Sequence, residues 1–175
     1  MKKTVTTILI SLSLLSHAHA EEYIDYVSVG LALQNIDNKH FDDGLAIVAN
    51  AGKSFYGDMA LEFEGATSLQ KIEAKAGDRK SDVDFWSIGI YGAYIWKINK
   101  LNIKPRLGIV FENIKSTINI KDPENPFTPT EKSGIAISGG IGLSYQFSQN
   151  YAVFTNYTKF EDDINHLTFG GEYKF

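Results

Sequence analysis

The chain has 175 residues, a formal net charge of −4 and no cysteine. That length suits a single domain, and the acidic balance argues against a nucleic-acid-binding protein. A chain without cysteine forms no disulfide and offers no thiolate for catalysis or metal binding.

The first predicted element is a signal peptide over residues 1–20. Two lysines precede a short apolar run, and an Ala-His-Ala triplet ending at Ala20 matches the small-x-small pattern of a cleavage site. The apolar run falls well short of the ~18–20 residues that a membrane-spanning helix needs. We therefore expect a Sec-type signal peptide cleaved after Ala20, and one mature domain over residues 21–175.

The rest of the chain alternates apolar and polar residues with a period of two, which predicts β-strands with one apolar and one polar face. Most of these segments have about the ~9–11 residues that a tilted membrane strand requires. The eight predicted strands cover residues 23–34, 45–53, 59–66, 84–96, 101–114, 134–147, 151–160 and 165–175. The predicted fold is all-β, an eight-stranded antiparallel up-and-down transmembrane β-barrel.

The connections between these strands support the same fold, because they are alternately short and long. Short periplasmic turns and longer extracellular loops are the usual asymmetry of a bacterial barrel. The turns are predicted at residues 54–58, 97–100 and 148–150, and the loops at residues 35–44, 68–83, 115–133 and 161–164.

The polar face of the strands is predicted to point into the barrel. It is rich in Gly, Ala and Ser, which suit a crowded bore, whereas a soluble barrel would turn this face to water. A Lys or Arg at the bilayer midplane would cost ~2–4 kcal/mol, so the charges on this face should point inward and pair. The predicted interior ion-pair network comprises Glu62, Glu64, Lys104, Arg106, Glu112, Glu172 and Lys174.

Aromatic residues on the apolar face predict two girdles at the membrane surfaces. Trp86 and Trp96 lie ten residues apart on one face of a strand, which at a tilt near ~40° spans about 25 Å, the height of the apolar band. Trp86 would lie in the outer girdle and Trp96 in the periplasmic one. The predicted girdle residues are Trp86, Trp96, Tyr145, Tyr151, Tyr173 and Phe175.

The signal peptide, the eight alternating segments and the ending Leu-Thr-Phe-Gly-Gly-Glu-Tyr-Lys-Phe over residues 167–175 resemble the small outer-membrane β-barrel superfamily, which includes the opacity-type adhesins and the transmembrane domain of outer membrane protein A. This resemblance implies a place in the bacterial outer membrane, in contact with its lipid and lipopolysaccharide. It also implies insertion by the barrel-assembly machinery through the C-terminal strand ending in Phe175.

One constellation in the last strand raises the question of catalysis. Some small outer-membrane barrels modify lipid A with a histidine beside a hydroxyl nucleophile and a carboxylate, and His166, Thr168 and Glu172 share one face here. The hydroxyl belongs to Thr, however, and this face points into the bore. We expect His166 to cap the extracellular end of the strand, with no catalytic residue, no cofactor and no metal site.

The predicted extracellular loops leave three functions open. Acidic clusters at residues 37–43 and 161–163 offer oxygen ligands but no fixed cation-binding spacing. The loop over residues 115–133 carries prolines and Phe127, and is the candidate site for a surface ligand. The leading hypothesis is a non-enzymatic barrel with a structural or surface-interaction role through its loops. The alternatives are a narrow pore for small or hydrophobic solutes and a lipid A-modifying enzyme.

Overall fold

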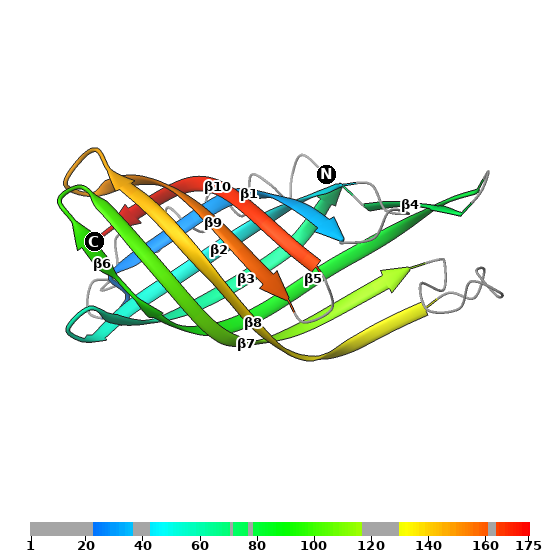
Figure 1. Ribbon diagram of the computed structural model, residues 1–175, viewed down its shortest axis with the longest axis horizontal. Helices are drawn as coiled ribbons and strands as arrows, with labels where there is room; N and C mark the ends of the chain where they lie inside the picture. The colour runs from blue at the N-terminus through cyan, green and yellow to red at the C-terminus, as the bar shows by residue number, and fades with distance from the viewer. Residues whose placement is uncertain (1–22, 37–42, 71, 77–78, 117–129, 161–163) are drawn as a thin grey trace.

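The computed structural model describes residues 23–36, 43–70, 72–76, 79–116, 130–160 and 164–175, and within them every regular element is a strand apart from a single helical position at Tyr23 (Figure 1). No helix of these residues is long and apolar enough to cross a membrane. The strands are β1 Tyr26–Ile36, β2 Gly44–Tyr56, β3 Met59–Gln70, β4 Ile72–Ala76, β5 Arg79–Tyr94, β6 Trp96–Ile98, β7 Leu101–Ser116, β8 Thr130–Gln146, β9 Tyr151–Phe160 and β10 Ile164–Lys174.

These ten segments make eight staves of one barrel. Strand β4 continues β3 and both pair with β5, while β6 continues β5 and both pair with β7. All pairs are antiparallel, and neighbours in the sheet are neighbours along the chain, as in an up-and-down barrel. The eight-stranded antiparallel barrel predicted from the sequence is therefore confirmed.

The barrel closes through the pairing of its first and last strands. Every residue of β1 has a partner in β10, from Tyr26 opposite Lys174 to Ile36 opposite Ile164. At the end of the barrel with the short turns, the Phe175 amide donates to the Asp25 carbonyl at 3.0 Å, and the Asp25 amide donates to the Gly52 carbonyl at 2.8 Å. This closure leaves no sheet edge along the seam.

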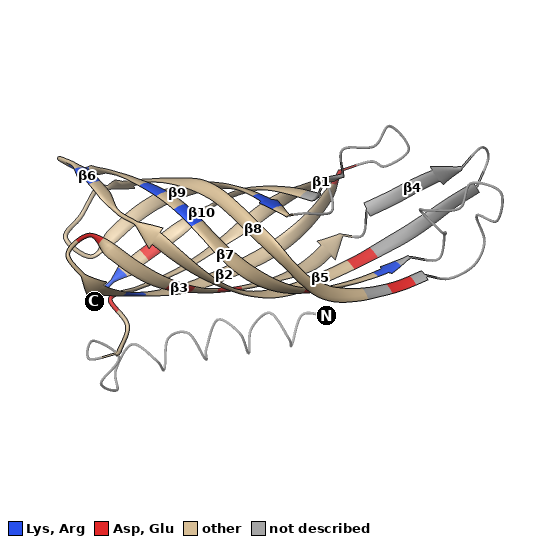
Figure 2. Cartoon of the chain, turned by 60° about the horizontal axis from the view of Figure 1, so that its bottom comes forward, with Lys and Arg blue, Asp and Glu red and all other residues tan. Residues whose placement is uncertain are grey.

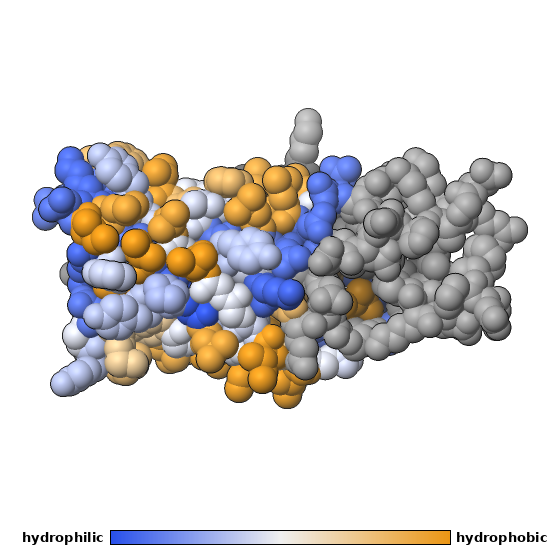
Figure 3. Space-filling view, in the orientation of Figure 1, coloured by the Kyte–Doolittle hydropathy of each residue, from blue (hydrophilic) through white to orange (hydrophobic). Residues whose placement is uncertain are grey.

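The two faces of the barrel differ as the alternation predicts. Leu107, Ile109 and Ile135 point outward and are 66%, 61% and 75% exposed. On the face seen in Figure 3, apolar side chains are spread along the part of the barrel that is not grey, and Figure 2 shows that most of the length of the described strands carries no charged residue. Polar and charged side chains instead lie buried inside the bore. An apolar outside around a polar inside is the arrangement of a barrel surrounded by lipid.

The end of the barrel opposite the short turns is higher on one side than on the other. The last pair between β8 and β9 is Ser138 opposite Phe160, but β8 stays paired with β7 as far as Thr130 opposite Ser116. The β4–β5 hairpin also projects beyond the ends of β9 and β10 (Figure 1).

Several predicted boundaries were wrong. Residues 54–56, predicted as turn, and residues 115–116 and 130–133, predicted as loop, are strand, because β2, β7 and β8 stay paired beyond their predicted ends. Residues 72–76 and 79–83, predicted as loop, are strand, because β4 and β5 continue their ladder beyond the predicted end of the third stave. The first strand begins at Tyr26 rather than at residue 23, where Tyr23 is 70% exposed. The third strand runs on from residue 66 to Gln70.

The predicted signal peptide lies outside the described residues. So do most of the loop over residues 115–133 and of the two acidic clusters. Of the first acidic cluster, Asp43 is described, and it accepts a hydrogen bond from the Asn35 amide at 2.7 Å.

The seam depends on a close approach between Gly30 of β1 and Gly170 of β10. A Cβ at position 170 would collide with the Val29 carbonyl oxygen and with the Gly30 Cα. We predict that Gly170→Ala lowers the free energy of unfolding by about 1–3 kcal/mol, the usual cost of overpacking. Urea titration of the protein refolded into lipid vesicles measures this loss.

The neighbouring Gly171 is the matched control. A Cβ there meets nothing within 4 Å, so Gly171→Ala should change stability by less than about 0.5 kcal/mol. Equal losses in the two variants would contradict the close-approach explanation.

Candidate functional site

The candidate site is the bore of the barrel, where charged side chains from three staves meet. Alternation along β3 turns Glu62 and Glu64 inward, and along β7 it turns Lys104 and Arg106 inward. Glu172 of β10 completes the set. All five are buried, with at most 6% of each residue exposed, so their charges must be compensated within the bore.

The compensation comes from a chain of alternating charges. The Lys104 ammonium donates to Glu62 Oε1 at 3.2 Å and to Glu172 Oε2 at 3.1 Å. Arg106 Nη1 lies 2.7 Å from Glu64 Oε2 and 3.4 Å from Glu62 Oε2. Glu62 therefore bridges the two cations, and both carboxylates of β3 face the guanidinium.

The chain of charges continues toward the end of the barrel that carries the short turns. The Lys174 ammonium lies 3.7 Å from Glu172 Oε1 and is 25% exposed, so it stands at the rim of the bore. Three carboxylates are thereby matched by three cations, and the charges in the chain balance. We call the six residues Glu62, Glu64, Lys104, Arg106, Glu172 and Lys174 the ion-pair cluster.

Tyr26 and Tyr91 lie against the ion-pair cluster, each with its ring over a cation and its hydroxyl near a carboxylate. The Tyr26 hydroxyl donates to Glu62 Oε1, and its ring lies 4.5 Å from the Lys104 Nζ. The Tyr91 hydroxyl lies 3.5 Å from Glu64 Oε1, and its ring centroid lies 4.4 Å from the Arg106 Cζ. Each ring thus offers its negative face to a cation, and the Tyr26 hydroxyl also donates to the carboxylate that pairs with that cation.

Contacts to further staves extend this network across the bore. The Arg106 Nη2 donates to the Thr158 hydroxyl of β9, and the Tyr91 hydroxyl donates to Ser138 Oγ of β8 at 3.0 Å. Sequence reasoning missed Tyr26, Tyr91 and Thr158 as members of the network. Their inward phase was visible in the alternation, but the contacts depend on which residues stand at the same height.

Glu112 was also predicted to belong to the ion-pair network, and its place in that network stays a prediction. It is buried on the inner face of β7, six residues beyond Arg106 along the strand. At ~3.3 Å per residue this separation is about 20 Å, too far for direct contact with Arg106.

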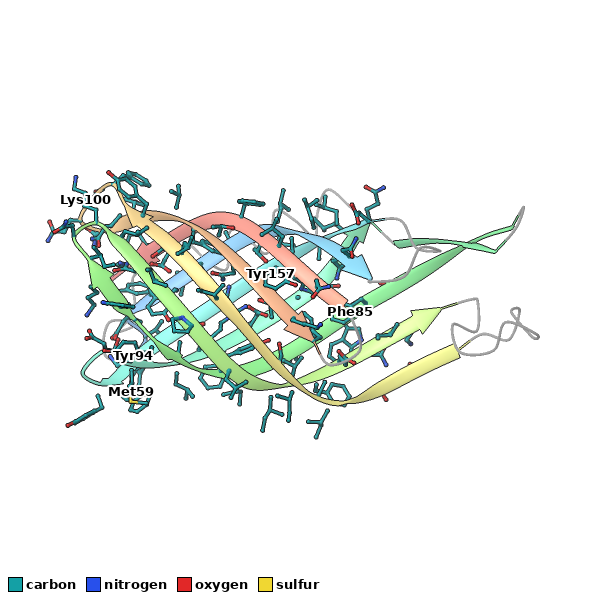
Figure 4. All side chains as sticks on the ribbon, viewed as in Figure 1. Met59, Phe85, Tyr94, Lys100 and Tyr157 are labelled. Atoms are coloured by element: carbon teal, nitrogen blue, oxygen red, sulfur yellow. The ribbon has the colours of Figure 1, made fainter. Side chains whose placement is uncertain are left out.

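A second layer fills the bore nearer the opposite end, away from the short turns, and is mostly apolar. Phe85, Phe160 and His166 are each 1% exposed, and their rings meet edge to face. The ring centroids of Phe160 and His166 are 4.7 Å apart, and those of Phe85 and Phe160 are 5.8 Å apart. Figure 4 shows Phe85 near the end of β9, away from the short turns. We call these three rings the aromatic plug.

The hydrogen bonds around His166 define its role. The Ser68 hydroxyl donates to Gln34 Oε1 at 3.0 Å, which turns the Gln34 Nε2 toward His166 Nε2 at 2.9 Å. Since the amide nitrogen can only donate, His166 Nε2 accepts and the imidazole is neutral. The His166 ring therefore packs against Phe85 and Phe160, and its Nε2 accepts from an amide instead of from a hydroxyl.

The predicted girdle residues lie on the outer face or at the rim. Trp86 is 39% and Trp96 60% exposed, and Tyr145 and Tyr151 also point outward. The rings of Tyr151, Tyr173 and Phe175 follow one another, with centroids 5.3 and 5.1 Å apart. Their place at the membrane surface remains a prediction.

Among the residues that the structure describes, no group of three or more His, Asp or Glu side chains is arranged to hold a metal ion.

The ion-pair cluster predicts a large effect for the loss of one carboxylate. Glu62→Gln leaves Lys104 and Arg106 buried with too few counter-charges, so the free energy of unfolding should fall by about 3–5 kcal/mol. The control is Asp58→Asn, which removes a carboxylate from an exposed ion pair with Lys97 and should cost about 0–1 kcal/mol. Urea unfolding of both variants in vesicles tests this, and a Glu62→Gln barrel as stable as Asp58→Asn would refute it.

Comparison with solved structures finds the same fold in small outer-membrane barrels. Neisserial surface protein A matches with a TM-score of 0.64 at 15% identity, covering 86% of this chain and 96% of that one. The attachment invasion locus protein Ail of Yersinia pestis, in complex with the heparin analogue sucrose octasulfate, matches with a TM-score of 0.60 at 17% identity, covering 86% and 97%. OprG of Pseudomonas aeruginosa matches with a TM-score of 0.65 at 11% identity, covering 87% and 96%.

A search of curated protein sequences finds no match. The model of the outer membrane protein beta-barrel domain matches residues 5–175, nearly the whole chain. With its closed eight-stave barrel, apolar outside and charged inside, the chain belongs to the outer membrane protein beta-barrel domain family.

Proposed function

We propose that this outer-membrane barrel is a non-enzymatic protein with a structural or surface-interaction role carried by its extracellular end. The observation that supports this proposal is the contrast between a filled bore and a raised extracellular end. The ion-pair cluster and the aromatic plug occupy two levels of the bore, and an eight-stranded barrel has an interior just wide enough for side chains to fill.

The raised end supplies the surface for an interaction. The ladder between β7 and β8 continues through residues 109–116 and 130–137, above the last pair of β8 with β9. The exposed ion pair between Lys115 and Glu131, with a distance of 3.0 Å, ties the two strands together there. Loops on such a rigid support are where recognition commonly resides, which favours the loop over residues 115–133 as the place for a surface ligand.

Two lines of support for this role come from the comparisons and from the sequence. Ail was crystallised with a heparin analogue, so a sulfated glycan is one ligand class to test here. The resemblance to opacity-type adhesins implies the same kind of role. Lipopolysaccharide is the other partner at this end, as the environment that surrounds the loops.

The maturation of the chain is part of the same proposal. The signal peptide over residues 1–20 is cleaved after Ala20, and residues 21–175 form the mature barrel. The barrel-assembly machinery recognises the outward aromatic side chains of β10, including Tyr173, together with Phe175. The girdle residues hold the barrel at the two membrane surfaces.

The alternative of a lipid A-modifying enzyme finds little support in the geometry. His166 accepts its hydrogen bond from Gln34, and its ring lies between Phe85 and Phe160 inside the bore. A lipid substrate would approach from the outer face, on the other side of the barrel wall. Unchanged lipid A mass spectra after deletion and overexpression are the expected result.

The filled bore predicts that the protein does not conduct. Planar-bilayer recordings of the refolded barrel should show no current steps above background, because the ion-pair cluster and the aromatic plug obstruct the bore at two levels. A double variant with Phe85→Ala and Phe160→Ala removes two rings of the plug but leaves the charged level, so it should stay silent as well. Regular steps in the unaltered protein would support the pore alternative instead.

The surface role predicts that a deletion strain loses adhesion while its permeability and lipid A composition stay unchanged. A variant in which residues 117–129 are replaced by a short Gly-Ser linker should reproduce the loss, because it keeps the barrel and removes the loop. The control replaces residues 148–149 of the short turn at the opposite end with Gly-Ser and should adhere normally. A permeability defect with intact adhesion would contradict the proposal.

A further inference from the structure

A depression lies between two turns at the periplasmic end of the barrel, far from the proposed surface interaction. It has a volume of about 320 Å³ and is lined by Lys100, Gln146, Phe147, Ser148 and Gln149. Lys100 belongs to the turn between β6 and β7, and the other four belong to the end of β8 and the turn that follows it. Figure 4 shows Lys100 at this end, beside the short turns.

Hydrogen bonds hold the walls of this depression in place. Asn99 adopts a φ of 55°, a left-handed conformation that asparagine tolerates, and so allows the tight turn into Lys100. The backbone N–H of Gln146 donates to the backbone carbonyl of Lys100 at 2.8 Å and links the two turns. The Gln146 side chain donates to the Gln149 carbonyl at 2.8 Å and accepts from the Lys174 ammonium at 3.2 Å.

Lys100 differs from the other lysines described at this end because no carboxylate among the described residues pairs with its ammonium. Lys53 lies 2.8 Å from Asp25, Lys97 lies 2.9 Å from Asp58, and Lys174 lies 3.7 Å from Glu172. Among the described residues, none pairs with the Lys100 ammonium, which is exposed at the depression. The depression is therefore a cavity open to solvent, with walls held by hydrogen bonds and with one lysine whose charge has no partner among the described residues.

A row of aromatic rings indicates the depth of this cavity in the membrane. Phe147 lines the cavity and stacks on Tyr151, with centroids 6.4 Å apart and planes at 18°. Tyr151 leads on to Tyr173 and Phe175 through the contacts described above. Aromatic rings at a barrel end favour the headgroup level of the bilayer. The cavity then lies where the phosphates of the periplasmic leaflet are.

We propose that this cavity binds the phosphate group of an anionic glycerophospholipid of the periplasmic leaflet. The Lys100 ammonium pairs with the phosphate, the Ser148 hydroxyl donates to a phosphate oxygen, and Phe147 contacts the beginning of an acyl chain. A lipid fits better than a free phosphate ion because Phe147 supplies an apolar contact beside the charge. The site is independent of any surface ligand at the opposite end.

The test is native mass spectrometry of the mature barrel in micelles doped with phosphatidylglycerol. Lys100→Gln should reduce the retained lipid about fivefold, which corresponds to the ~1 kcal/mol that one lysine contributes at an anionic membrane surface. Lys97→Gln is the matched control, because it removes the same charge from the same end but outside the cavity, and it should retain the lipid as the unaltered protein does. Lys100→Arg should restore retention.

Three results would overturn the proposal. Equal losses in Lys100→Gln and Lys97→Gln would mean general electrostatic attraction, and an unchanged Lys100→Gln would mean that the cavity binds no lipid. Displacement of the lipid by millimolar inorganic phosphate would assign the site to a soluble anion. The heat-dependent gel mobility of each variant verifies that the barrel is folded, and Ser148→Ala, which leaves every charge in place, should lower retention less than Lys100→Gln.

Discussion

The closure of the backbone ladder between β1 and β10 is the constraint on which the rest of the structure depends. Inside a bilayer, an unpaired amide or carbonyl finds no water, so every strand must have two neighbours. The paired seam from Tyr26 to Ile36 provides this for the first and last strands. Closing the sheet with eight staves then fixes a bore too narrow for water to solvate charges freely, and an outer face that must be apolar. Both consequences are visible in the burial of the side chains.

The narrow bore explains why the ion-pair cluster is balanced and why its members come from so many staves. An unmatched buried charge is strongly destabilising, whereas a matched set with further hydrogen bonds is tolerated. Glu62, placed between Lys104 and Arg106, joins β3 to β7, and Lys104 joins β7 to β10. The contacts of Tyr26, Tyr91 and Thr158 add β1, β5 and β9. The backbone ladder connects each stave only to its neighbours, so these contacts across the bore give the barrel a second, independent set of constraints.

Much of this could be predicted from the sequence, because the period of two is a local property. Which of two neighbouring residues faces the bore follows from alternation alone, and this was sufficient to predict the inward charges of β3, β7 and β10. Heights could not be predicted in the same way, since they depend on the tilt of the strands and on the register of every pair. That is why Phe85, Phe160 and His166 were not recognised as a layer. The β4–β5 hairpin was missed for a different reason, because the alternation of Ile72, Ala74 and Ala76 with Glu73 and Lys75 covers only five residues.

A filled bore moves any function to the two ends, and the ends differ in their physical character. At one end, β7 and β8 continue past the last pair of β8 with β9, and this is the end where we propose that a surface ligand binds. At the other end, the turns are short and Lys100 lies beside Phe147, and this is where we propose that a lipid phosphate binds. Asp25 illustrates how strongly this end is organised. Burial raises the pKa of its carboxyl, but hydrogen bonds from Lys53 and the Ser54 amide outweigh burial, so the pKa lies below its usual value. The carboxylate is therefore charged at neutral pH, and its contribution to stability would be lost only as the pH falls through that lowered pKa. Asp25 pairs with Lys53 and Asp58 pairs with Lys97, whereas no residue that the structure describes pairs with Lys100, which is why we place the lipid phosphate at Lys100.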